Sequence, residues 1–278
     1  MLFKVVSDSA INIRKAKGSV PFASVPLKIR AGEKEYVDDE ALDVQEMATY
    51  MESYKGKSGT SCPSVEDYVQ AFGEADRVIC VTITSGLSGS YNAARVAKEE
   101  YESIYPDKKV FVVDSLSAGP EMELLTDKAE ELFLQGKTFE EICSGVMDYK
   151  EKTGLMFSLE CLNNLSNNGR VSPVVAKIAG VLGIRIVGRA SMQGQLEPMD
   201  KCRGEKKALL AIVKRMKEIG YAGGKVMIDH CFNPGAAQQL KELILKEFPK
   251  AKVTQGLTGG LCSFYAEKGG LLAGFEIG

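Results

Sequence analysis

The chain contains a single histidine, His230, among its 278 residues. A site that needs two imidazole ligands is therefore excluded. The seven cysteines are scattered and include no Cys-x-x-Cys pair, so the sequence supports neither a disulfide framework nor a zinc site. We expect reduced, mostly buried thiols that pack as small apolar side chains, and we expect no metal or cofactor.

The sequence also lacks an excess of charge and any long apolar run. Thirty-five basic residues stand against 37 acidic ones, for a formal net charge of -2, which indicates neither nucleic acid nor an anionic membrane as a partner. No stretch approaches the roughly 20 apolar residues that span a bilayer. The first apolar run is too short for a signal peptide and is interrupted by Lys4. We expect a cytoplasmic protein.

Short apolar runs rich in β-branched residues alternate with helical patterns along the chain. The runs are continuous rather than alternating, as in strands buried on both faces, and they occupy 3–6, 25–29, 78–83, 110–113, 184–187 and 225–229. Apolar residues spaced three and four apart predict helices over 39–54, 64–72, 91–101, 121–134, 139–149, 206–219 and 236–248. This alternation predicts an α/β fold with mainly parallel sheets.

The chain divides near residue 153. A polar stretch over 150–153 follows a predicted helix and precedes a new apolar run over 154–159. We therefore predict an N-terminal α/β domain over 1–153 and a C-terminal α/β domain over 154–278. The last apolar run, 269–275, is a candidate edge strand, and the glycines of 256–262 suit a tight turn.

The most informative segment is 81–92 (VTITSGLSGSYN), in which a buried strand ends, a turn follows and a helix begins. Ligands of open α/β sheets lie beyond the carboxyl ends of strands, and a helix N-terminus there favours an anion. Gly86 and Gly89 permit a close approach of the backbone, and the hydroxyls of Ser85, Ser88 and Ser90 can donate hydrogen bonds. The alternative is that Ser88 or Ser90 only caps the helix.

Two further segments carry candidate anion-binding side chains. Thr60 and Ser61 fall in the loop ahead of a helix that Ser64 can cap, and the alternative for this pair is a plain polar loop. Arg170 lies between an Asn- and Gly-rich turn and the next helix, where it can pair with a carboxylate or phosphate. The alternative for Arg170 is an ordinary surface arginine.

Two more positions have open interpretations. His230 follows the predicted strand 225–229 at its carboxyl end, so it either faces a ligand or hydrogen-bonds a neighbouring loop. Arg203 belongs to the basic segment 198–207, which is either a solvated face or a docking site for an acidic or phosphate-bearing partner.

No catalytic set emerges from these residues. A Ser-His-Asp triad would have to use His230 in an unusual chain order. The chain has no Gly-x-Ser-x-Gly elbow, because Ser88 lies in the sequence GLSG. A hydrolase or transferase with Ser88 as nucleophile remains an alternative to a binding protein.

Taken together, six segments resemble the DegV family in order and spacing. The segment 7–9 (SDS) is similar to the family's Asp-Ser opening, 60–64 (TSCPS) to its TSQPS loop and 85–91 (SGLSGSY) to its SGLSGTY turn. Further along, 112–115 (VVDS) resembles its VIDS strand end, 168–172 (NGRVS) its GGRIS segment and 201–204 (KCRG) its KxRG motif. The resemblance covers essentially the whole chain.

The resemblance implies two α/β domains with a long-chain fatty acid between them. The family's carboxylate-binding threonine and serine correspond to Thr60 and Ser88, and its nearby arginine corresponds to Arg170. With the neighbouring candidates Ser61, Ser85, Gly89 and His230, these residues form the predicted fatty-acid site. Candidate lining residues for the apolar tail are Phe157, Leu159, Ile178 and Leu182, with ordinary core packing as the alternative for each.

The resemblance also implies a partner. Some members present the bound acid to a fatty acid kinase, which makes Arg203 a candidate docking residue. A regulatory protein whose lipid is a structural plug is an alternative that shares the same pocket. The chain departs from the family at 257–262 (LTGGLC), which lacks the histidine and proline of the usual HTGPG turn, and at 168 and 184–187. These departures bear on the head group, the tail length and the kinase pairing rather than on the fold.

Overall fold

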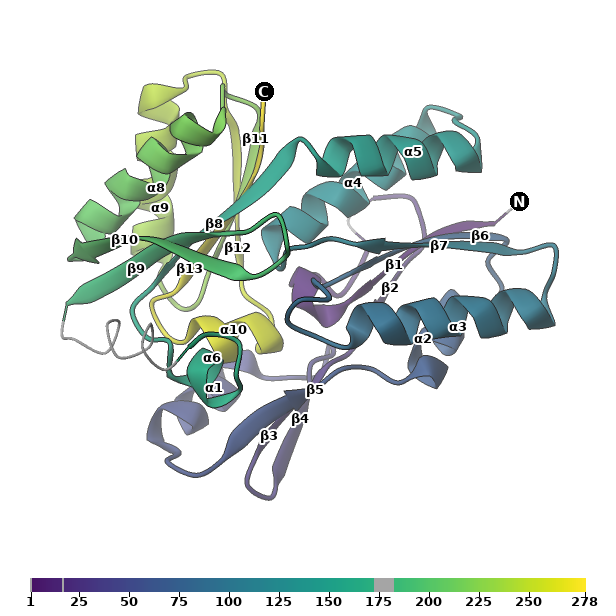
Figure 1. Ribbon diagram of the computed structural model, residues 1–278, viewed down its shortest axis with the longest axis horizontal. Helices are drawn as coiled ribbons and strands as arrows, with labels where there is room; N and C mark the ends of the chain where they lie inside the picture. The colour runs from purple at the N-terminus through teal and green to yellow at the C-terminus, as the bar shows by residue number, and fades with distance from the viewer. Residues whose placement is uncertain (1, 17, 173–182) are drawn as a thin grey trace.

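The computed structural model describes residues 2–16, 18–172 and 183–278, and Figure 1 shows their arrangement. The first sheet, sheet A, has the order β2-β1-β6-β7 and is parallel throughout, as the sequence predicts. Its strands are β1 (Phe3–Asp8), β2 (Phe22–Val25), β6 (Arg77–Thr82) and β7 (Lys109–Asp114). The sequence run 25–29 does not form one strand. Pro26, which lacks an N–H for a ladder, separates β2 from the next strand.

Helices cover both faces of sheet A, which explains why its strands are apolar without alternation. Figure 1 shows α2 (Val65–Phe72) and α3 (Ser90–Ile104) on one face, and α4 (Pro120–Leu134) and α5 (Phe139–Lys150) on the other. Val5, Ile79 and Val81 pack with α4 and α5, whereas Val6 and Cys80 pack with α2 and α3. Ser64 caps α2, as predicted, and the structure shows a complete capping box with Asp67.

The second large sheet, sheet C, has the order β10-β9-β8-β13-β11-β12. Its strands are β8 (Thr153–Leu159), β9 (Ile184–Ala190), β10 (Leu196–Arg203), β11 (Lys225–His230), β12 (Lys252–Leu257) and β13 (Leu271–Glu276). Only β11 and β12 pair in parallel, and the other neighbours are antiparallel. Sheet C is therefore mixed, not mainly parallel. Helices α8 (Glu205–Ile219) and α9 (Pro234–Glu247) pack on one of its faces.

The last strand, β13, lies between β8 and β11 in the interior of sheet C, so its prediction as an edge strand is wrong. Helix α4 contacts β1 and β6 of sheet A and β8, β11 and β13 of sheet C, so it lies between the two sheets. Gly274 of β13 permits this contact, because a Cβ there would lie 2.5 Å from the Glu121 backbone nitrogen.

The remaining elements are smaller, and β3, β4, β5 and α1 among them lie at the bottom of Figure 1. A three-stranded antiparallel sheet has the order β4-β3-β5 and consists of β3 (Lys28–Ala31), β4 (Lys34–Val37) and β5 (Ser58–Ser61). The short helices are η1 (Ser9–Ile11), α1 (Val44–Ser53), α6 (Asn163–Asn167) and α10 (Gly260–Ala266). The glycine-rich stretch 256–262, predicted as a turn only, thus contains the start of α10. Within the described ranges, none of the helices has the length and apolarity needed to cross a membrane.

Candidate functional site

A cavity of about 290 Å³ lies where the two halves of the chain meet. Its lining comes from β5, the turn before α3, β8 and α10, and from the loops beside them. The apolar members of the lining are Leu27, Ile83, Leu87, Ala118, Leu155, Phe157, Leu159, Leu165, Leu196, Leu261, Cys262, Ala266 and Leu272. An apolar cavity of this size with few polar groups is typical of a small-molecule site.

Strand β8 supplies one wall of the cavity by the two-residue period of a strand. Leu155, Phe157 and Leu159 belong to the lining, whereas Met156 between them packs in the core beneath α8 and α9. Both faces of β8 are therefore buried, which explains its uninterrupted apolar sequence. The predicted lining residues Phe157 and Leu159 are in place. Ile178 and Leu182 lie outside the described residues.

Three polar members of the lining, Thr60, Tyr265 and Arg170, lie close together. The hydroxyls of Thr60 on β5 and Tyr265 on α10 are 2.8 Å apart. The Arg170 guanidinium lies 5.9 Å from the centre of the Tyr265 ring. Its Nε donates a hydrogen bond of 3.1 Å to the carbonyl of Leu87, the residue before Ser88. Hydroxyl and guanidinium donors thus gather at one part of a cavity that is otherwise apolar.

Ser88 belongs to the turn that leads into α3. The N-cap of α3 is Gly89, which has no side chain to cap the helix. Ser88 Oγ lies 3.0 Å from Ser90 Oγ and accepts a hydrogen bond from the Ser90 backbone nitrogen at 3.3 Å. Gly86 lets the β9–β10 connection approach the turn, since a Cβ there would lie 2.8 Å from the Gly194 carbonyl oxygen. This turn of the N-terminal half therefore packs directly against the β9–β10 connection of the C-terminal half.

A buried carboxyl group, Asp8, lies behind this turn at the end of β1. Its oxygens accept hydrogen bonds from the backbone nitrogens of Ile83 at 2.8 Å and Ala10 at 3.2 Å. Desolvation raises the pKa of Asp8 to about 7, and hydrogen bonds from Ile83, Ala10, Tyr68 and Ser90 oppose that rise. Asp8 is thus linked to Ser88 through the Ser90 hydroxyl.

The structure brings most of the predicted site residues together. Thr60, Ser61, Ser88, Gly89 and Arg170 all belong to the cavity lining. Ser85 of the same turn does not. It is exposed, and its backbone nitrogen donates a hydrogen bond of 3.0 Å to the Asp114 carboxylate.

His230 is also not part of the cavity lining. Its Nδ1 accepts a hydrogen bond of 3.2 Å from the Asn233 backbone nitrogen, which is the loop contact that the sequence left open. Burial lowers the pKa of His230, so the imidazole is neutral at neutral pH. Arg203 ends β10, is exposed and does not belong to the cavity lining.

Tyr265 is the member of the polar cluster that the sequence did not predict. It lies in an apolar helix, α10, where the sequence indicates only that a tyrosine packs in the core. Its position opposite Thr60 depends on contacts between residues 205 positions apart. The only local signal was the unusual sequence of the preceding turn, which already departs from the family pattern.

The whole chain is similar to proteins of the DegV family. The family model described as "Uncharacterised protein, DegV family" matches residues 2–275. A DegV domain-containing protein of Streptococcus pyogenes serotype M1 is 44% identical over 280 residues, which cover 100% of both chains.

Two solved structures are similar over nearly their whole length. One is the fatty acid kinase (Fak) B3 protein of Streptococcus pneumoniae loaded with linoleic acid, with a TM-score of 0.98, 43% identity and 100% of both chains covered. The other is a DegV family protein from Eubacterium eligens loaded with heptadecanoic acid, with a TM-score of 0.97 and 41% identity. The match covers 99% of the present chain and 100% of the other.

Proposed function

The chain belongs to the DegV family, and from this premise we propose that it binds one long-chain fatty acid in the cavity between its two halves. The cavity carries the proposal, because a cluster of hydrogen-bond donors opens onto a lining that is apolar elsewhere. Such a lining suits an acyl chain, and each buried CH₂ contributes about 0.8 kcal/mol to binding. The relatives loaded with linoleic and heptadecanoic acids support the same ligand class.

In this proposal, Thr60 and Ser88 donate hydrogen bonds to the ligand carboxylate, and Arg170 provides a positive charge nearby. Ser61 and Gly89 line the same part of the cavity, and the N-terminus of α3 adds a favourable dipole. Ser85 and His230 do not line the cavity, so the proposed carboxylate site does not include them.

We further propose that the protein is a cytoplasmic carrier that presents the acid to a partner fatty acid kinase, with Arg203 as a candidate docking residue. The relative named as a fatty acid kinase B3 protein supports this role. A serine nucleophile would need a general base within hydrogen-bond reach. The neighbour of Ser88 Oγ is another hydroxyl, Ser90, which favours a binding role over catalysis.

Mass spectrometry of organic extracts from the purified, denatured protein tests the ligand class. We expect about one equivalent of a fatty acid. Ser88→Ala and Thr60→Val in delipidated protein are each expected to weaken binding about tenfold or more, since each removes a hydrogen bond to a charged group.

Ser85→Ala provides the matched control, because Ser85 belongs to the same turn but not to the cavity lining. Its affinity is expected to stay within about twofold of the unmodified protein. An extract without lipid, together with no binding of added fatty acid, would contradict the proposal. Exchange of bound for labelled acid then separates a carrier from a protein with a permanent lipid.

A further inference from the structure

We propose that the Tyr265 hydroxyl is an additional ligand of the fatty-acid carboxylate, so that the head group is held from both halves of the chain at once. This inference rests on the proposed function and assigns a role to a residue of the same site. It starts from the contact between Tyr265 Oη and Thr60 Oγ1, which are 2.8 Å apart and both line the cavity.

The two hydroxyls have two O–H donors between them, and the hydrogen bond that joins them uses only one. A hydroxyl donates one hydrogen bond and accepts two, so one of the pair donates to the other while the second O–H has a further acceptor to find. An ionised carboxylate is an acceptor only, with room for several donors. A carboxylate placed beside this pair can accept the O–H that remains, or both O–H groups if the pair gives up its mutual hydrogen bond.

Tyr265 is a suitable donor because it keeps its proton at neutral pH. Burial raises the pKa of its phenol, although Thr60 and the nearby Arg170 act in the opposite direction. The Arg170 guanidinium, 5.9 Å from the ring centre, favours a negative ligand at the same place.

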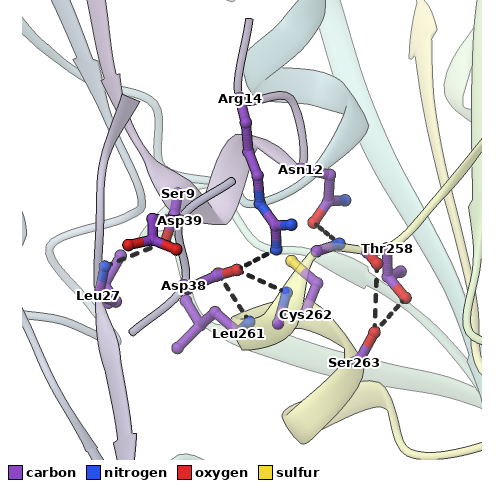
Figure 2. A network of polar contacts seen from close by, with 12 residues as sticks. Ser9, Asn12, Arg14, Leu27, Asp38, Asp39, Thr258, Leu261, Cys262 and Ser263 are labelled. Atoms are coloured by element: carbon purple, nitrogen blue, oxygen red, sulfur yellow. Dashed lines mark hydrogen bonds and ion pairs between the residues drawn. The ribbon is translucent and has the colours of Figure 1, made fainter. Parts of the chain in front are cut away.

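The ring is held in position before a ligand arrives. Tyr265 packs edge-on against Phe264, with 4.9 Å between ring centres. The helix that carries it is fixed at its start, because Gly260 and Leu261 donate backbone hydrogen bonds to buried Asp38, as Figure 2 shows. A donor that needs no ordering on binding contributes more to affinity.

The test compares the binding of linoleic acid with that of methyl linoleate, using delipidated protein. Tyr265→Phe is expected to weaken linoleic acid binding about tenfold or more. Because the ester has no negative charge, its binding is expected to change by about twofold at most. Tyr105→Phe, at an exposed tyrosine that does not line the cavity, is the matched control and leaves both affinities unchanged.

A second arm asks whether Tyr265 acts only by orienting Thr60. In a Thr60→Val background, adding Tyr265→Phe is expected to weaken linoleic acid binding further. No further loss in that background would overturn the inference, as would an equal loss for acid and ester. Failure of the proposed function would look different, because the unmodified protein would then bind neither ligand.

Discussion

Asp8 shows how a single buried group makes stability depend on pH. The side chain is fully buried, and desolvation raises its pKa from 3.8 to about 7. Between these values the folded protein holds a proton that the unfolded chain has released. Stability therefore falls as the pH rises from about 4 to 7 and is constant above that range.

We predict that Asp8→Asn removes this slope. The contribution of Asp8 at low pH amounts to at most about 4 kcal/mol, at 1.36 kcal/mol per pKa unit. Urea unfolding at pH 5, 6, 7 and 8 measures the difference between the unmodified and variant proteins, which is expected to shrink with rising pH. The control is Asp107→Asn at an exposed position, and a difference independent of pH would contradict the prediction.

At the scale of single residues, the sequence predicts side chains at turns better than side chains within helices. Thr60, Ser88 and Arg170 stand beside Gly, Ser and Asn clusters, which mark loops at strand ends where ligands bind. Tyr265 has no such marker, because its direction depends on how α10 packs against β3, the strand next to β5. His230 lies at a strand end as well, yet its ring bonds with the neighbouring loop instead.

At the scale of elements, the approach of β13 to α4 depends on one missing side chain. A Cβ on Gly274 would lie 2.5 to 2.8 Å from backbone atoms of Pro120 and Glu121. Backbone at the start of a buried helix cannot move aside at low cost. We therefore predict that Gly274→Ala destabilises the protein by about 1–3 kcal/mol, as overpacking of a core does.

Gly235→Ala is the matched control for this substitution. Gly235 is exposed in the first turn of α9, and no atom lies within 4 Å of its Cβ position. Alanine is expected to raise stability there by about 0.5–1 kcal/mol, because it restricts the unfolded chain. If urea unfolding shows the same change in the free energy of unfolding for both substitutions, the close contact between β13 and α4 does not contribute to stability.

The order of strands is the part of the fold that local sequence does not specify. The helices α2, α4, α5 and α8 lie within one or two residues of their predicted bounds, because apolar periodicity and caps are local signals. The position of β13 in the interior of sheet C results from pairing with β8 and β11, which are distant in sequence. An apolar run at a chain end gives no indication of these partners.

At the scale of the whole molecule, a polar network joins the two halves beside the cavity, as Figure 2 shows. Asp38 accepts hydrogen bonds from Gly260 and Leu261 at 2.8 and 2.9 Å and pairs with Arg14 at 2.5 Å. The Asn12 amide bridges Asp229 and Gly259 at 2.6 and 2.9 Å. Both Asp38 and Asn12 belong to the N-terminal half, whereas their backbone partners begin α10.

This network links global stability to ligand binding, because α10 also supplies Leu261, Cys262, Tyr265 and Ala266 to the cavity lining. We predict that Asp38→Ala lowers the free energy of unfolding by about 3–5 kcal/mol, since it leaves Arg14 and two buried N–H groups without their acceptor. A bound fatty acid stabilises the folded state by about 2.7 kcal/mol at a concentration 100 times its Kd. The variant is expected to gain less at the same concentration, because its displaced α10 weakens binding.

Urea unfolding with and without linoleic acid measures both effects in one experiment. Asp39→Ala is the control, because Asp39 is the adjacent carboxylate but is exposed, and its side chain accepts a local hydrogen bond of 2.9 Å from the Ala41 backbone nitrogen. Equal stability of the two variants would show that the network does not join the halves. Another outcome is that the Asp38→Ala protein loses stability and yet is stabilised by the ligand as much as the control is. That result would show that α10 keeps its place without Asp38. The packing of α4 between the sheets would then be what holds the two halves together.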